Sequence, residues 1–597
     1  MRAHSPDNSI LSFSSCRLRN NSVIGQGGAV HSILATVKAT ETVFTQNTAS
    51  NGGAIALLAT SQSTFTDCKF DGNAAAFDGG AILSLSSLTL MEGCEFSGNR
   101  ARDDGGAMYT SRGSSIFRNC DFTENSATLF SSANGGAIYM WNSDSIFEYC
   151  SFNRNSARND GGAVALRTST SSIENCDFTG NDAGDDGGAL FTRLGSEVAV
   201  KNCFFEENTT GDDGGAIYTI TTQSLLEENH FVKNSAGVDG GAIHVSNDCT
   251  TVMEKCLFDS NNANTDGGAI SLRDNCSLNG CRFDGNSAFL GGAILSRSTA
   301  TLTTDNCDFT DNAAFAGGGI VSEGFSDLTD SRFEGNSASV GGAIFAGSLE
   351  FSSTVPAETT ISGRTLFQCN SASSDFGGGG GAVLSRLGRL SMTDAEIIGN
   401  SAGESGGGIY LGINSTSSFE RCLFEQNIAG SVGGGAIASG EFGPLATLTM
   451  NATVFHGNDV DFSGASSDDI FDFSLPSNSI FECGSGYGNC FCDADANSTI
   501  VPNITTNDLP TICSGAGVGQ TCDQSCASSI RPVCNEPASL PAITSGITSR
   551  FGDANAQNIN VWDMLQKGVD DDEDGDEDDG EDARKYDERM KEMDMGQ

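Results

Sequence analysis

Apolar and polar side chains alternate in short segments over most of the chain. Residues 120–122 (Cys-Asp-Phe) place a charged residue between two apolar ones, and residues 176–178 repeat the same triplet. A period of two residues is typical of a β-strand with one buried face, whereas an amphipathic helix would place apolar residues three and four positions apart. The pattern therefore predicts many short β-strands rather than helices.

Two sequence motifs recur in constant phase with a period near 26 residues. The first is Gly-Gly-Ala-Ile or a close variant, and its third residue falls at Ala29, Ala54, Ala81, Ala107, Ala137, Ala163, Ala189, Ala216, Ala242, Ala269, Ala293, Gly319, Ala343, Ala382, Gly408 and Ala436. The second is Phe-x-x-Asn, from Phe44 with Asn47 to Phe455 with Asn458. Gly and Asn tolerate positive φ angles, so both motifs also mark turns. Sixteen copies of one unit indicate a repeat architecture.

A single unit has too little apolar surface to fold alone. Burial of one Phe, one Ile and one Cys contributes roughly 5 to 8 kcal/mol, whereas ordering one unit costs on the order of tens of kcal/mol of chain entropy. If each unit is one turn of a solenoid, its strands pair with their equivalents about 4.8 Å above and below. We therefore expect an all-β fold, a right-handed single-stranded parallel β-helix of about 16 coils over residues 1–460. A leucine-rich-repeat horseshoe has a similar period, but its Leu-x-x-Leu-x-Leu frame is absent from the sequence.

The paired Gly-Gly-Ala-Ile and Phe-x-x-Asn motifs resemble the repeats of the chlamydial polymorphic outer membrane proteins and of pectin-lyase-like β-helix proteins. The resemblance covers about residues 10–460. It implies a surface-exposed β-helix with a role in adhesion. After residue 460 the chain departs from the chlamydial family, because a cysteine-rich stretch and an acidic tail follow. Autotransport, which is typical of that family, is therefore not implied.

Composition narrows the range of partners. The 597 residues include 31 Lys and Arg against 77 Asp and Glu, which gives a formal net charge of -46. Such a chain repels nucleic acids and anionic membranes, so we expect neither as a partner. The sequence contains no run of 18 apolar residues, so a membrane-spanning helix is not expected either.

Cysteines and glycosylation sequons favour an extracellular or cell-surface location. The chain has 21 Cys, and disulfides and N-glycans both belong to the secretory route. The Asn-x-Ser/Thr sequons lie at Asn20, Asn208, Asn275, Asn414, Asn451, Asn497 and Asn503. No secretory signal is visible before the first repeat, so we expect the true start of the protein to lie upstream of Met1.

A series of aspartates is the first candidate for chemistry. An Asp stands directly before Gly-Gly in several units, and five consecutive units carry it: Asp160, Asp186, Asp213, Asp239 and Asp266. Stacked carboxylates about 5 Å apart repel by about 1 kcal/mol even in water, so the series needs compensation. The side chains could accept hydrogen bonds from the N–H groups of their own Gly-Gly turns. Alternatively they could bind a line of Ca²⁺ ions, which prefer oxygen ligands. No other cofactor is expected.

The cysteines form a second regular series, two residues before the Phe of the second motif. Its members are Cys16, Cys68, Cys94, Cys120, Cys150, Cys176, Cys203, Cys256, Cys281, Cys307 and Cys422. We expect a buried column of free thiols that pack as small apolar groups. Metal binding by this column is not expected, because no Cys-x-x-Cys or Cys/His spacing accompanies it. Cys249 and Cys276 lie outside the series and are the predicted disulfide between adjacent coils.

No catalytic residue can be assigned from the sequence. The Asp recurs at one phase of many units, whereas an active site would be a local exception, and the five His share no motif. The sequence favours a scaffold that acts in adhesion or binds matrix, a glycan or an extracellular protein. The alternative is a polysaccharide lyase or glycoside hydrolase that acts on an acidic polysaccharide, because β-helix enzymes of that kind combine carboxylates and basic residues from neighbouring coils.

Departures from the repeat predict loops and a different carboxyl end. Residues 348–362 and 128–133 are insertions, expected as loops on one flank. Residues 461–536 contain seven Cys and are expected to form a small disulfide-stapled cap, with zinc as the alternative. Residues 537–568 are expected to be a linker, and residues 569–597 a disordered acidic tail.

Overall fold

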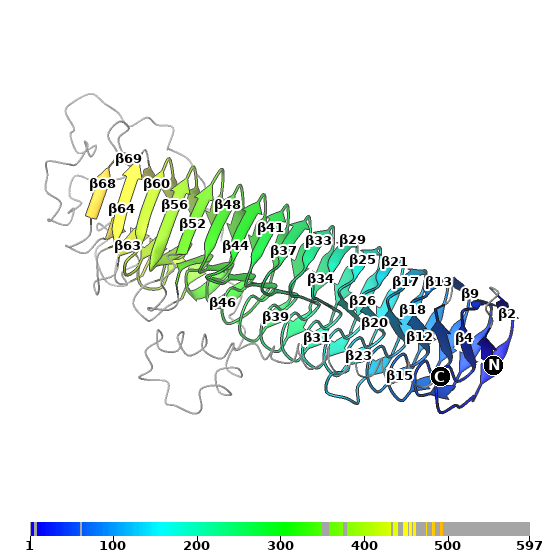
Figure 1. The fold of residues 1–597 in the computed structure, drawn as a ribbon. Helices are drawn as coiled ribbons and strands as arrows, with labels where there is room; N and C mark the ends of the chain where they lie inside the picture. The colour runs from blue at the N-terminus through cyan, green and yellow to red at the C-terminus, as the bar shows by residue number, and fades with distance from the viewer. Residues whose placement is uncertain are drawn as a thin grey trace, which may run out of the picture.

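The computed structural model describes residues 2–4 and 9–460, except for 60–61, 349–356, 374–378, 431–433, 440–445, 452 and 457, together with 473–474, 480–483 and 490–492. These residues form β-strands joined by turns and include no helix. Accordingly, the described part of the chain has no helix that could cross a membrane. The strands stack into one long rod, which runs from the N-terminal strands to the last labelled strands (Figure 1).

One turn of the chain contains four short strands. A representative coil consists of β24 (Val164–Arg167), β25 (Thr170–Glu174), β26 (Asp177–Thr179) and β27 (Asp182–Ala183). A loop then leads to β28 (Leu190–Arg193), which pairs with β24 in parallel, with Val164 beside Leu190. The predicted repeat of about 26 residues is therefore one coil.

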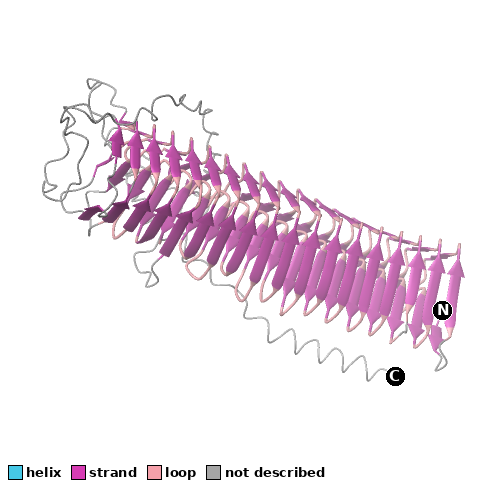
Figure 2. Ribbon diagram, turned by 90° about the horizontal axis from the view of Figure 1, so that it is seen from above, coloured by secondary structure: helices cyan, strands magenta, loops and turns pink. Residues whose placement is uncertain are grey.

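Equivalent strands of successive coils form continuous sheets along the rod (Figure 2). Sheet A runs from β1 (Arg2–His4) to β67 (Phe473–Ser474), sheet B from β2 (Ile10–Ser14) to β68 (Ile480–Cys483), and sheet C from β3 (Arg17–Arg19) to β69 (Cys490–Cys492). Sheet D, the shortest in strand length, runs from β7 (Thr48–Ala49) to β66 (Asp459–Val460) and is reduced to isolated bridges at Ser287. The fold is the expected right-handed parallel β-helix of about 16 coils.

Columns of identical side chains fill the interior. Phe178 lies between Phe152 and Phe205, with both ring centroids 4.7 Å away. The same stacking continues without interruption from Phe44 to Phe367. The phased Phe residues are therefore stacked directly over one another, as predicted from their spacing.

The Asn of each Phe-x-x-Asn motif forms a second column, which we call the Asn ladder (Asn47 to Asn458). The side-chain Nδ2 of Asn181 donates to Oδ1 of Asn208 at 2.9 Å and to the carbonyl oxygen of Phe152 at 3.0 Å. Its own Oδ1 accepts from the backbone N–H and the Nδ2 of Asn155, both at 3.0 Å. Each buried amide is thereby fully bonded, which is what burial of a polar group requires.

The Gly-Gly pair is required where neighbouring coils approach most closely. Gly187 has a φ of 63°, a conformation that L side chains rarely adopt. A Cβ on Gly188 would overlap the carbonyl oxygen of Gly215 in the next coil. The first Gly therefore supplies a backbone conformation and the second supplies space.

One predicted insertion is only partly a loop. Ala357–Ser362 form strand β52, which pairs with β48 (Phe325–Thr329) and β56 (Gly388–Thr393). The prediction of a loop over 348–362 is wrong there, because Ala357, Thr359 and Ile361 alternate with more exposed residues and are buried. Residues 349–356 of the same insertion lie outside the described part. Residues 128–133 do form a loop, with the Leu129 side chain exposed.

Little of the predicted C-terminal organisation can be compared with the structure. The predicted linker (537–568) and acidic tail (569–597) lie outside the described residues, as does the predicted cap (461–536) apart from β67, β68 and β69. The backbones of these three strands pair with the preceding coil in sheets A, B and C. Strand pairing therefore continues beyond residue 460.

The cysteine series is a column of free thiols, as expected. Its members from Cys68 to Cys422 are buried, and Cys16 at the end of the rod is partly exposed. Neighbouring members contact each other, since the backbone N–H of Cys150 lies 3.4 Å from Sγ of Cys176.

The structure does not contain the predicted disulfide between Cys249 and Cys276, because both are buried free thiols. The strand register pairs Cys276 with Thr251 rather than with Cys249. This offset of two residues places the two Cα atoms about 8 Å apart, which is beyond the reach of a disulfide. Burial also raises the pKa of both thiols.

Candidate functional site

The outer face of sheet A carries the side chains that alternate with core residues. In β20 (Ile138–Trp141), Ile138 and Met140 belong to the core, so Tyr139 and Trp141 point to the opposite side. One outward position per coil forms what we call the aromatic row: Tyr109, Tyr139, Ala165, Phe191, Tyr218 and His244. Ring centroids are 5.3 Å apart for Phe191 and Tyr218, and 5.1 Å apart for Tyr218 and His244. The rings therefore stack along the rod axis.

The predicted aspartates form a second row, the Asp row (Asp160, Asp186, Asp213, Asp239 and Asp266), at the turn before sheet A. Oδ1 of Asp186 accepts from the backbone N–H of Asp213 at 3.1 Å, and Oδ1 of Asp213 from that of Asp239 at 2.8 Å. These bonds link the carboxylates of Asp160, Asp186 and Asp213 to the equivalent residue of the next coil, because the coils stack in register. They differ from the expected bonds between each carboxylate and its own Gly-Gly turn.

Burial makes this row electrostatically unfavourable. The pKa of Asp186 is raised well above its ordinary value, first by burial and then by the charges of Asp160 and Asp213. Burial likewise raises the pKa of Asp104, which occupies the same position in an earlier coil. A raised carboxyl pKa means that the folded state disfavours the charged form. A cation that reached the row would relieve this repulsion.

Arginines form a third row at the other end of the sheet A strands. They stand four residues after the third residue of the Gly-Gly-Ala motif, at Arg167, Arg193, Arg273, Arg297 and Arg386. Arg297 forms an ion pair with Asp266, and its Nη1 lies 3.6 Å from Oε2 of Glu323. Nη2 of Arg273 lies 3.9 Å from Oδ2 of Asp239. The last two carboxylates of the Asp row therefore face guanidinium groups.

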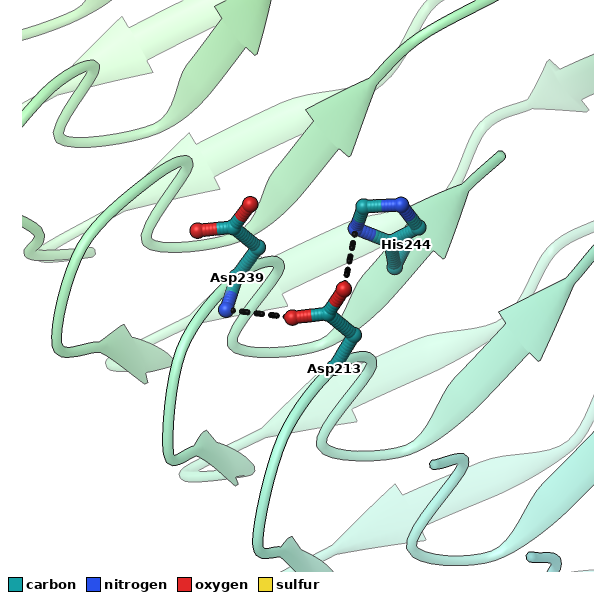
Figure 3. A group of neighbouring side chains, drawn as sticks. All are labelled: Asp213, Asp239 and His244. Carbon is teal, nitrogen blue, oxygen red and sulfur yellow. Dashed lines mark hydrogen bonds and ion pairs between the residues drawn. The ribbon is translucent and has the colours of Figure 1, made fainter. Parts of the chain in front are cut away.

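Asp213, Asp239 and His244 form a compact cluster between these rows (Figure 3). Asp213 precedes β32 (Ile217–Thr219), Asp239 precedes β36 (Ile243–Val245), and His244 belongs to β36. One ligand atom from each side chain lies within 4.8 Å of those of the other two. Burial, followed by the charges of Arg273 and Arg297, lowers the pKa of His244 well below its ordinary value. The imidazole is therefore neutral near pH 7.

The structure brings the five predicted aspartates together in consecutive coils, as their spacing indicated. The five His share no motif in the sequence and none was predicted as a site residue, whereas the structure places His244 beside Asp213 and Asp239. Two signals in the sequence could have found it. Arg recurs at one phase of the repeat, and His244 follows the third motif residue by two positions, which is an outward position of sheet A.

Comparison with known proteins agrees with this architecture. A family described as "right handed beta helix region" matches residues 4–137 and 136–309, more than half of the chain. The repeat of the Chlamydia polymorphic membrane proteins matches residues 330–347. No match was found among curated proteins.

Among solved structures, the chain is similar to the PL6 family alginate lyase AlyGC. The identity is 11% and the TM-score 0.22, over 81% of this chain and 96% of the lyase. So low a TM-score says nothing about activity. The family match and the stacked coils lead to one conclusion: the chain belongs to the right-handed β-helix family.

Proposed function

We propose that the protein is a cell-surface or extracellular scaffold that binds a glycan along the outer face of sheet A. The observation that carries the proposal is that carboxylates, guanidinium groups and aromatic side chains lie in neighbouring coils of this face, with all three present in the coil of Asp186, Phe191 and Arg193. Asp239, Arg273 and Tyr218 represent the three rows near the cluster. Carboxylate and guanidinium groups form strong, directional hydrogen bonds, which suit the neighbouring hydroxyls of a sugar.

The spacing of the coils favours an extended chain as ligand. Successive coils rise by about 4.8 Å, which is close to the length of one sugar residue in an extended polysaccharide. Successive sugars would therefore meet successive coils, which carry different combinations of these groups. The rings of the aromatic row stack on one another and are largely buried, with Tyr218 5% exposed, so a ligand would contact only their exposed edges.

A surface location is supported by the match to the chlamydial repeat and by accessible sequons. Asn20, Asn275 and Asn414 are exposed and can accept a glycan. Asn208 cannot accept one in the folded protein, because it is buried in the Asn ladder and bonded to Asn234. Peptide mapping of the native protein would therefore find Asn208 unmodified.

Calcium binding along the Asp row is also part of the proposal. The backbone bonds use Oδ1 of these residues, and guanidinium groups face Asp239 and Asp266. We therefore place Ca²⁺ at the Asp160 and Asp186 end of the row, where carboxylate oxygens are its natural ligands.

Affinity electrophoresis of the full chain in gels that contain polygalacturonate, alginate or neutral glycans tests the function. We expect at least one polymer to retard the protein without release of products. Tyr218→Ala should weaken this binding at least tenfold. The matched control is Phe204→Ala, since Phe204 is an exposed aromatic residue on the outer side of sheet C, in β30 (Phe204–Glu206).

No retardation by any polymer, or equal weakening in both variants, would contradict the proposed binding face. Release of unsaturated or reducing-end products would instead identify the protein as a polysaccharide lyase or hydrolase.

A further inference from the structure

We propose that Asp213, Asp239 and His244 bind a divalent transition-metal ion of the Zn²⁺ type. The three residues come from two consecutive coils and present two carboxylates and one imidazole to a common point (Figure 3). This inference does not depend on glycan binding, because it concerns three residues of two coils rather than the whole repeated face.

The separations fit such an ion. Ligand atoms of a tetrahedral zinc site lie about 3.4 Å apart when each bond is about 2.1 Å long. Nδ1 of His244 lies 3.5 Å from Oδ2 of Asp213, which is already this separation. Only the Asp239 carboxylate has to move closer, since the ligand atoms of all three residues lie within 4.8 Å of one another.

The unbonded nitrogens of His244 indicate that an ion binds beside its ring. Its side chain is 1% exposed, and neither Nδ1 nor Nε2 has a hydrogen-bond partner among the described residues. A buried imidazole normally uses its nitrogens. The ring is held by stacking on Tyr218, with an interplanar angle of 6°. Asp213 is held by the backbone N–H of Asp239. Two of the three ligands are thus oriented in advance.

The chemistry of the ligands selects the class of metal. Imidazole nitrogen suits Zn²⁺, Co²⁺ and similar ions, whereas Ca²⁺ takes oxygen ligands alone. An imidazole binds a metal ion through the lone pair of a nitrogen in its neutral form. Arg273 pairs with Asp239 and Arg297 with Asp266, whereas the Asp213 carboxylate lies beside His244, where it would attract a cation.

The sequence contains a matched control. His31 occupies the same position of the repeat in the first complete coil, where it pairs with Ala56 as His244 pairs with Ser271. Its coil has Gln26 in place of Asp239. His31 therefore has the same place in the fold without the carboxylate of its own coil.

Titration of the chelator-stripped full chain with Co²⁺ tests the proposal. We expect one equivalent to bind with the visible absorption bands of a low-coordinate site, and Zn²⁺ to displace it where Ca²⁺ does not. His244→Gln and Asp213→Asn should each weaken Co²⁺ binding at least tenfold, whereas His31→Gln should leave it unchanged. Asp213→Asn keeps side-chain size, so it also serves if His244→Gln fails to fold.

Three results would overturn the proposal: Co²⁺ bands that persist in a folded His244→Gln or Asp213→Asn variant, displacement by Ca²⁺ as effective as by Zn²⁺, and a thiolate charge-transfer band that assigns the ion to cysteine.

Discussion

The Asn ladder and the Asp row are two columns built by the same stacking rule, with opposite electrostatic results. In both, one side chain per coil accepts a hydrogen bond from the backbone N–H of an equivalent residue in an adjacent coil. The Asn amide also donates two hydrogen bonds, so both its oxygen and its nitrogen have partners. Because the amide is neutral, no charge accumulates along the ladder. The carboxylate has no proton to donate and repels its neighbours. A repeat thus multiplies whatever one residue contributes, whether stabilising or destabilising.

The largest expected effect comes from placing a carboxylate in the Asn ladder. Asn181→Asp removes the donations to Asn208 and Phe152 and buries a charge that has no partner. We expect the free energy of unfolding to fall by about 3 to 5 kcal/mol, measured by chemical denaturation at pH 7. Asn262→Asp, at an exposed position of β39 (Asn262–Ala263), is the control. Equal losses of stability in the two variants would show that burial in the Asn ladder is not the cause of the effect.

A smaller loss is expected where the Asp row is interrupted by an amide. Asn134 stands at the Asp position of its coil, and its Nδ2 donates to Asp104 at 3.3 Å and to the carbonyl of Ser132 at 2.8 Å. Asn134→Asp replaces these donations with repulsion and should cost about 1 to 3 kcal/mol. The same denaturation experiment measures it. An unchanged midpoint would show that water screens the row.

The smallest effect has the opposite sign. Asp186→Asn removes a carboxylate whose pKa is raised by burial, and an Asn at this position can still accept the backbone N–H, as Asn134 does from Asp160. We expect stability at pH 7 to rise by about 1 kcal/mol for each unit by which the pKa was raised. Thermal and chemical unfolding of the variant and the native chain measure the gain.

The pH dependence of that gain checks its cause. A carboxyl whose folded pKa lies above its unfolded value, about 3.9, costs nothing below the unfolded value. It costs progressively more as the pH rises through the folded value. The advantage of Asp186→Asn should therefore vanish near pH 4 and grow toward neutral pH. A gain that is constant with pH would point to packing rather than charge.

The sequence was sufficient to predict the rod because its signals are local and repeated. Phe178 and Asn181 each imply a column once the spacing of one coil is known, and the structure confirms both columns. The disulfide prediction failed because 27 residues of separation does not fix register, and an offset of two positions separates Cys276 from Cys249. Strand β52 was not predicted, because the extra residues between Ala343 and Ala382 indicated a loop.

The candidate site was predicted only in part. The Asp positions follow from the repeat, but their hydrogen-bond donors depend on how closely the coils stack, which no single unit reveals. His244 was missed because it is a rare residue at a position that is usually apolar. His244 is recognised as part of a site only when Asp213 of the preceding coil and Arg273 of the following coil are placed beside it.

Strand pairing that reaches only one coil in each direction makes the rod extensible. Duplication of residues 164–189 in the gene would add a coil whose neighbours are already of the right kind, because β24 and β28 present equivalent edges. Such a duplication would also add one more aspartate to the Asp row and one more arginine to the arginine row. The rod can therefore lengthen by whole coils without any redesign of its interior.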